Sequence, residues 1–463
     1  MAGWAAAVRI VREALQVGDR DYTAMDLRRA VVLLSIPMVL EMAMESLFAL
    51  VDVFFVSRLG TEAVAVVGLT EGVMMVVYSL AWGLGAGITA LVARRTGAKD
   101  REGADTAAVQ GLLLALLLGL GLAVPGLWYA PQLLHLMGAA PEVVQLGTPF
   151  MRWMVGTHAV VLLLFAINAV FRGAGDAAMA MRALWIANII NMVLDPLLIF
   201  GFGPVPAMGV TGAAVATVVG RSCGVAYQCW HLFDGRGKVA LAARHLRVVR
   251  AEMLSTLRLS AAATAQFLIA SASWLFLVRI VAGFGSDAVA GYTIAVRIIV
   301  FVLLPAWGVA NAASTLVGQN LGAGRADRAE RSAWLCGHYN MIYMTSMAVL
   351  FFALAPAVVS LFSTGPEVVG TGVLALRIVS LGYFFYAYGM VLSQALNGAG
   401  DAMTPVWLNL FCFWVVEIPL AWWLAQRMQG AEGVFTAIAI SESLLAVCCA
   451  LAFRSGRWKA MKV

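Results

Sequence analysis

Three carboxylic acids lie inside one long apolar stretch of this chain. Residues 33–57 are almost wholly apolar and long enough to cross a bilayer, yet they include Glu41, Glu45 and Asp52. At 100° per residue, the three acids fall within an arc of about 40° on one helical face. Because a carboxylate near the centre of lipid costs roughly 2.5–3.5 kcal/mol, we expect this face to meet a water-filled cavity or partner helices. For Glu41 and Glu45, a purely structural polar contact is the alternative.

A second polar face occurs in the apolar run at 183–201, where Asn188, Asn191 and Asp195 fall within an arc of about 60°. Asp195 and Asp52 lie at similar distances from the outer ends of their runs, which predicts a similar depth. Two carboxyl groups in one cavity can hold a proton and release it, and Asn191 adds an oxygen suited to Na⁺. The alternative for Asp195 is a contact with backbone freed by the following proline.

Composition places the chain in the membrane. It has 463 residues, of which 62% are hydrophobic and 12% charged, and its mean hydropathy is +0.88. Soluble domains carry about a quarter charged residues. The six cysteines and five histidines show no spacing typical of a disulfide framework or a metal centre, so we predict neither a metal site nor a cofactor.

Pro37 lies inside the first apolar run and removes a backbone hydrogen bond from its helix. It therefore predicts a hinge in that helix, with a static kink as the alternative.

Apolar runs and basic loops together predict twelve spans. Lys and Arg gather in alternate loops, which favours cytoplasmic termini in a cell inner membrane and argues against a nucleic-acid partner for a chain of net charge +6. In this assignment Arg172 belongs to a cytoplasmic loop. The apolar runs lie at 33–57, 64–91, 108–129, 151–171, 183–201, 210–232, 257–281, 288–316, 334–361, 374–396, 404–425 and 433–453.

The sequence also repeats itself. At a constant offset of 225 residues, AVA and AWG motifs recur and GAGDA at 173–177 meets GAGDA at 398–402. Two parallel six-helix halves are typical of alternating-access transporters. Asp52, Glu45 and Glu41 align with Leu277, Ala270 and Gln266, so the acids are confined to the first half. We expect an all-α fold with an N-terminal segment, a first lobe, a linker, a second lobe and a tail, at 1–30, 31–232, 233–256, 257–453 and 454–463.

The runs PMVLEMAMESLFALVDVFFVSRLG, NMVLDPLLIFGFGP and GVTGAAVATVVGR and the duplicated GAGDA together resemble the multidrug and toxic compound extrusion (MATE) family. The resemblance covers about residues 25–455 and is closest to the branch of DNA-damage-inducible efflux proteins. It implies a two-lobed transporter that exports amphipathic, often cationic compounds in exchange for H⁺ or Na⁺. It places the coupling cation on Asp52, Asn191 and Asp195, with Thr217 as a further ligand. We favour H⁺, because Na⁺ requires more oxygens.

Methionine and aromatic side chains are the predicted cargo contacts, because thioethers adapt to varied shapes and aromatic faces attract organic cations. The alternative for each of them is an ordinary core or lipid-facing role. Glu417 is taken as the only acid well inside a span of the second half, with a structural role. We expect a monomer embedded in the bilayer. The residues assigned to the cavity or to cargo are Glu41, Glu45, Asn188, Met38, Met42, Tyr383 and Tyr386, and Pro37 is the assigned hinge.

Two other functions remain open. A lipid-linked saccharide flippase of the same superfamily would need a strongly basic cavity. Here Arg297 is the clearest basic residue deep in a span, and Arg221 is assigned near a cytoplasmic end. The acids predicted in the cavity favour a cationic cargo instead. An intramembrane aspartyl protease is suggested by the GxGD pattern that ends at Asp176 and again at Asp401. Both aspartates are predicted in cytoplasmic turns, which argues against a protease.

Overall fold

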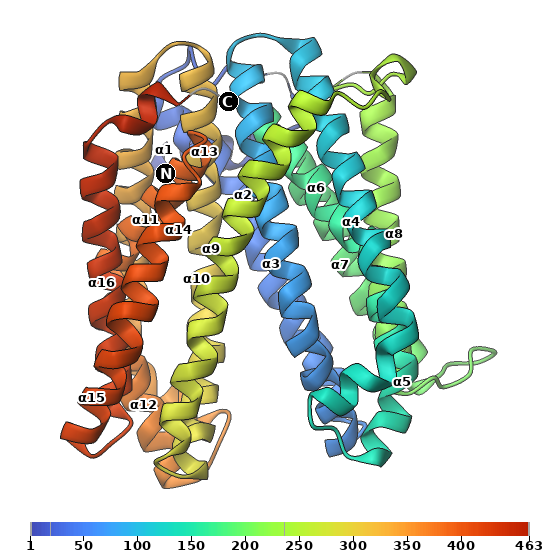
Figure 1. Cartoon of the computed structure of the whole chain (residues 1–463), viewed down its shortest axis with the longest axis vertical. Coiled ribbons are helices and arrows are strands. Elements are labelled where there is room, and N and C mark those ends of the chain that lie inside the picture. Colours follow the sequence, from blue (N-terminus) through green and yellow to red (C-terminus); the bar gives the residue numbers. More distant parts are fainter. Residues whose placement is uncertain (1, 19, 236, 462–463) are drawn as a thin grey trace. The chain divides into compact units, whose positions relative to one another are not determined.

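The computed structural model describes residues 2–18, 20–235 and 237–461, and almost all of them are helical (Figure 1). The helices are α1 (Ala2–Ala14), α2 (Leu27–Ser57), α3 (Thr61–Gly97), α4 (Arg101–Leu136), α5 (Pro141–Gly156), α6 (His158–Ala174), α7 (Ala177–Phe200), α8 (Val210–Phe233), α9 (Arg250–Ala282), α10 (Ser286–Gly322), α11 (Ala326–Ser360), α12 (Pro366–Leu381), α13 (Tyr383–Gly398), α14 (Met403–Asn409), α15 (Ile418–Met428) and α16 (Glu432–Arg454). A π-helical segment, Leu410–Glu417, joins α14 to α15, and short 3₁₀ turns lie at Ala243–His245 and Arg457–Ala460.

Among the described residues, eight helices are long and apolar enough to cross a membrane, and the bent pairs α5–α6 and α12–α13 raise the number to ten. Helices α2 and α8 cover the two remaining apolar runs of the sequence. The predicted all-α membrane fold is confirmed. The amphipathic helix α1 precedes the first of these spans.

The repeat seen in the sequence recurs in the helix boundaries. Helices α3 and α10 are each 37 residues long, and both start after a glycine with φ of 103°, Gly60 and Gly285. This backbone conformation is readily available only to glycine, which explains why the residue recurs. The bends in the two halves also correspond, at 41° between α5 and α6 and 61° between α12 and α13.

Contacts divide the chain into two compact units. Unit 1 holds the residues up to Asp21 and Leu40–Thr264, and unit 2 holds Tyr22–Val39 and the residues from Ala265 onward. Helices α2 and α9 are therefore each divided between the two units. The acids of α2 and the polar face of α7 all belong to unit 1.

Glycines bring α7 and α8 into close contact within unit 1, where the two helices run beside each other in Figure 1. A Cβ atom added to Gly220 would lie 2.4 Å from the carbonyl oxygen of Ala187, and one added to Gly212 would lie 2.5 Å from that of Leu198. Small residues allow helices in membranes to approach until their backbones touch. The GVTGAAVATVVGR run is thus explained as the surface that receives α7 and its polar side chains.

This close approach predicts opposite effects for two matched substitutions. Gly220→Ala should destabilise the protein by about 1–3 kcal/mol, because overpacking forces the α7 backbone to move. Gly121→Ala, in α4, meets no atom within 4 Å and should be neutral or stabilising, because alanine favours helix over glycine by roughly 0.5–1 kcal/mol. Thermal unfolding of both variants in detergent, followed by circular dichroism, checks the prediction. Equal melting temperatures for Gly220→Ala and the parent chain would contradict it.

Candidate cation site and buried polar network

The polar face predicted for α7 is present and buried. Asn188, Asn191 and Asp195 are spaced by three and four residues, so they follow one face of the helix, and they are 3%, 2% and 0% exposed. Neither carboxyl oxygen of Asp195 has a hydrogen-bond partner in the described part of the chain. Because buried polar groups in proteins are nearly always paired, this carboxyl group is an exception that needs an explanation.

The other predicted ligands are linked to Asp195 or to one another. The side-chain amide of Asn191 donates a hydrogen bond to the hydroxyl of Thr217, on α8, over 2.9 Å, and the Asn191 Oδ1 atom has no partner among the described residues. Asp52, half-buried on α2, interacts electrostatically with Asp195, and Glu71 and Arg221 act on Asp52 in turn. The structure thus gathers Asp52, Asn191, Asp195 and Thr217, and their role in ion binding stays a prediction.

The remaining acids of α2 are held by polar side chains of unit 1. Glu45 accepts a hydrogen bond from Asn188 over 3.1 Å. Glu41 is 1% exposed and forms a salt bridge of 2.8 Å with Arg172, while Asn168 donates to the same carboxyl oxygen over 3.3 Å. In this structure Glu41 is a buried, paired group, so the alternative of a structural contact has direct geometric support.

Arg172 corrects the sequence assignment, which placed it in a cytoplasmic loop. It lies in the last turn of α6 and is 9% exposed. A long side chain near a helix end can reach inward as well as outward, and here the carboxylate of Glu41 compensates its charge. Hydropathy alone gives no signal that the Arg172 side chain points inward, because that orientation depends on a partner 131 residues away.

Unit 2 contains a neutral version of this network. Gln266, the repeat counterpart of Glu41, accepts a hydrogen bond from Asn397 over 3.1 Å and donates one to Ser393 over 2.8 Å. Asn397 and Ser393 are the counterparts of Arg172 and Asn168 at the same offset. Each unit therefore joins corresponding helices at corresponding positions: α2 and α6 through a charged pair in unit 1, and α9 and α13 through amides in unit 2.

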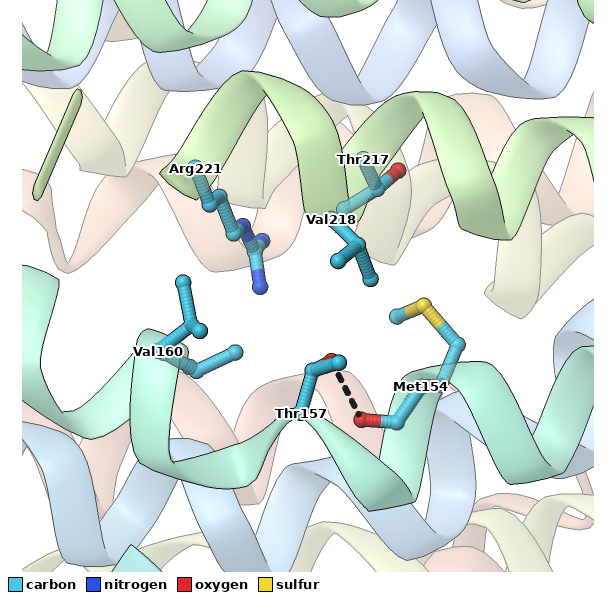
Figure 2. A pocket seen from close by; sticks show the side chains of 7 residues that line it. Met154, Thr157, Val160, Thr217, Val218 and Arg221 are labelled. Carbon is cyan, nitrogen blue, oxygen red and sulfur yellow. Dashed lines mark hydrogen bonds between the residues drawn. The ribbon is translucent and has the colours of Figure 1, made fainter. Parts of the chain in front are cut away.

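Arg221 is a further correction, because it is in the middle of α8 and is 6% exposed. It donates a hydrogen bond to the Tyr78 hydroxyl over 3.0 Å and lies over that ring at 5.6 Å. Figure 2 shows Arg221 and Val218 pointing from α8 toward the break between α5 and α6, with Thr217 also at the edge of the space. They line a small pocket whose other walls are Met154, Thr157, Val160 and Val161. The pocket brings one basic group to the Thr217 side of the candidate cation site.

The two methionines assigned to cargo belong to different units and differ in burial. Met42 is half-buried in unit 1. Met38, in unit 2, is fully buried, and a Cβ atom on Gly308 would lie 2.7 Å from the Met38 carbonyl carbon. Pro37 lies within α2, which continues as a helix on both sides. Their roles in cargo binding and bending stay predictions.

The two tyrosines assigned to cargo are near acids of unit 2. Tyr383 is 1% exposed, and Tyr386 interacts electrostatically with Glu417 and Glu442. Glu442 lies in α16 and is 7% exposed. The expectation that Glu417 is the only acid inside a span of the second half is therefore wrong, because Glu442 also lies inside an apolar run, at 433–453.

The duplicated GAGDA motifs form turns that begin helices. Gly175 and Gly400 have φ of 85° and 89°. Asp401 accepts a hydrogen bond from the Thr404 hydroxyl over 2.8 Å, as expected of a residue at a helix start. Burial raises the pKa of Asp176 to about 6, although Lys238, Arg182 and Arg20 act in the opposite direction. Helix initiation accounts for the motif without any protease chemistry.

Comparison with known proteins identifies the family. The MatE family model matches residues 37–197 and 262–423, one match in each half. An FAD transporter of Shewanella oneidensis is 28% identical over 403 residues, covering 87% of this chain and 89% of its own. A probable multidrug resistance protein NorM of Thermotoga maritima is 24% identical over 442 residues and covers 94% of both chains.

Solved structures agree with the sequence comparison. A multidrug resistance MATE family transporter in an outward-facing conformation superposes with a TM-score of 0.88 at 30% identity, covering 94% of this chain and 96% of its own. The family match spans well over half of this chain and falls on the two repeated halves. The protein therefore belongs to the MatE family, whose members are secondary transporters rather than enzymes.

Proposed function

We propose that this transporter exports amphipathic, often cationic compounds across the cell inner membrane in exchange for H⁺ bound at Asp52, Asn191 and Asp195. The observation that carries the proposal is the Asp195 carboxyl group, which is fully buried and has no hydrogen-bond partner in the residues described. An ionised carboxylate in that state is unfavourable unless a proton or another cation joins it. Asp52 supplies a second carboxyl group that interacts with the first.

The choice of H⁺ over Na⁺ rests on geometry. Two neighbouring carboxyl groups share a proton with little demand on their arrangement, whereas Na⁺ is best bound by several oxygens at once. Neutral oxygens on this side of α7 are Asn191 Oδ1, one turn before Asp195, and the Thr217 hydroxyl that Asn191 contacts. We also propose that the protein belongs to the DNA-damage-inducible branch, acts as a monomer and has both termini in the cytoplasm, as its basic loops favour.

Transport into everted vesicles tests the proposal. A cationic dye should accumulate when respiration generates an H⁺ gradient, and a potential near 150 mV supplies ~3.5 kcal/mol per charge, or a ~300-fold gradient. Asp52→Asn should reduce accumulation to the passive level, because the carboxyl pair loses one member. Glu62→Gln, an exposed acid in the first turn of α3, should retain full accumulation. Undiminished H⁺-driven accumulation by Asp52→Asn would remove this residue from the mechanism.

The same assay decides between the two ions. Accumulation that follows an imposed Na⁺ gradient and ignores an H⁺ gradient would overturn H⁺ coupling while leaving the site in place. Accumulation under neither gradient, by protein that is folded and inserted, would overturn the antiport mechanism.

An anionic flavin is the second candidate cargo. One of the relatives, 28% identical, is an FAD transporter, and FAD carries a negatively charged diphosphate. Arg221 lines a pocket beside Thr217 and is the basic group that favours such a cargo. Flavin uptake should be measured in the same vesicles, with Arg221→Gln as the variant. Flavin uptake that exceeds dye uptake and is lost in Arg221→Gln would favour this candidate.

A further inference from the structure

Two buried acids of unit 2 lie outside the site just described. Glu417 ends the π-helical segment Leu410–Glu417 and is 3% exposed, while Glu442 is 7% exposed on α16. Their carboxyl groups interact electrostatically. The corresponding region of unit 1 is α7, which is α-helical throughout. Because π-helical insertions are rare and frequently mark functional sites, the irregular backbone at Glu417 points to a role particular to this unit.

The surroundings of the two acids supply oxygen atoms and no positive charge. The Ser441 hydroxyl donates a hydrogen bond to Glu417 Oε1 over 2.9 Å, and the Ser273 hydroxyl acts on the same carboxyl group. Over residues 2–18, 20–235 and 237–461, no basic side chain acts on either carboxyl group, and Oε2 of each acid has no hydrogen-bond partner. Two uncompensated carboxylates so deeply buried would be strongly unfavourable. The pair therefore needs a cation.

Tyr292 provides an independent indication of a ligand. It is 3% exposed on α10, interacts electrostatically with Glu417, and its hydroxyl has no partner in the described chain. Its ring is fixed by stacking on Phe435 of α16, with centroids 6.0 Å apart and planes 3° apart. A buried hydroxyl held in this way is costly unless something completes its hydrogen bonding.

The other titratable groups around the pair are neutral at physiological pH. They are tyrosine and cysteine side chains from the helices packed against α16 and from α16 itself, with unperturbed pKa values of about 8.5–10 for these residue types. None of them can balance a carboxylate. One or both acids act electrostatically on Tyr386 of α13, Cys412 of the π-helical segment and Cys449 of α16.

We propose that Glu417 and Glu442 form a second monovalent-cation site, in which the two carboxyl groups share one H⁺ or hold one Na⁺. Ser441, Ser273 and Tyr292 provide the neutral oxygens around it. The site draws on α9, α10, α16 and the π-helical segment, all within unit 2 for these residues. The proposed site shares no residue with the Asp52–Asn191–Asp195 set, so it can be tested independently of that set.

Infrared titration of the purified full chain tests the site without any transport assay. The chain carries Asp52→Asn and Asp195→Asn, so that the first site does not contribute, and the buffer is free of sodium. A protonated-carboxyl stretching band should persist at neutral pH and be lost when Glu417→Gln and Glu442→Gln are added. Glu432→Gln, an acid in the first turn of α16, should leave the band unchanged. A spectrum unaltered by the Glu417→Gln and Glu442→Gln pair would overturn the site.

Salt exchange and a milder variant complete the test. Loss of the band on replacing choline chloride with sodium chloride identifies Na⁺ as a competing occupant, and an unchanged band identifies H⁺. Ser441→Ala should shift the midpoint of the band's pH titration, because its hydroxyl contacts Glu417. Ser443→Ala should not, since its hydroxyl donates to the Ala439 carbonyl of its own helix. Identical midpoints for the two serine variants would contradict the proposed contact, even if the glutamine variants fold poorly.

Discussion

Asp195→Asn is expected to abolish ion-coupled transport and, at the same time, to make the protein more stable. Loss of transport follows because asparagine cannot bind and release a proton at physiological pH. The gain in stability follows because the substitution removes an ionisable group that is 0% exposed and has no hydrogen-bond partner in the described residues. Single stabilising substitutions commonly yield about 0.5–2 kcal/mol, so the melting temperature should rise.

The pairing of these two results distinguishes a functional acid from a structural one. If Asp195 served only to satisfy backbone freed by Pro196, its replacement would lower the melting temperature and leave coupling intact. Dye accumulation in everted vesicles and thermal unfolding in detergent measure the two effects on the same variant. Glu142→Gln, at an exposed acid in the first turn of α5, should change neither quantity. A destabilised Asp195→Asn protein that transports normally would show that the acid is structural.

Removal of Arg172 should have the largest effect on stability. Arg172→Asn leaves the carboxylate of Glu41 buried at 1% exposure without its salt-bridge partner. Breaking a buried pair by removing one partner typically costs about 3–5 kcal/mol. Arg152→Asn, an exposed arginine of α5, is the matched control and should have an effect within about 0.5 kcal/mol.

The second half of the chain supplies the rescue variant. Glu41→Gln combined with Arg172→Asn recreates the amide pair that unit 2 forms between Gln266 and Asn397. The double variant should recover most of the stability lost by Arg172→Asn, since no buried charge remains unpaired. Unfolding in detergent, analysed as a double-mutant cycle, measures the coupling between the two positions. Additive effects of the single changes would show that Glu41 and Arg172 do not depend on each other.

Local patterns in the sequence were sufficient to predict the membrane class, the helical runs and the repeat. These features depend on neighbouring residues, because a span needs about 20 apolar residues in succession and a helical face follows from 3.6-residue periodicity. The polar face of α7 was predicted in this way, and Asn188, Asn191 and Asp195 are all buried on that helix. The constant offset of 225 residues likewise anticipated the matching starts of α3 and α10.

Tertiary packing alone decided how the charged residues are paired. Arg172 pairs with Glu41 across 131 residues, and Arg221 bonds to Tyr78 across 143, so no local window contains both partners. Hydropathy treats an arginine at a helix end as a loop residue, although a buried carboxylate within reach makes the inward orientation stable. Glu442 differs from these cases: the sequence shows it inside the apolar run at 433–453, and only its interaction with Glu417, on another segment, required the structure. Amino-acid order thus determined which segments are helical, whereas the contacts among them determined which buried acids are paired with a base and which are not.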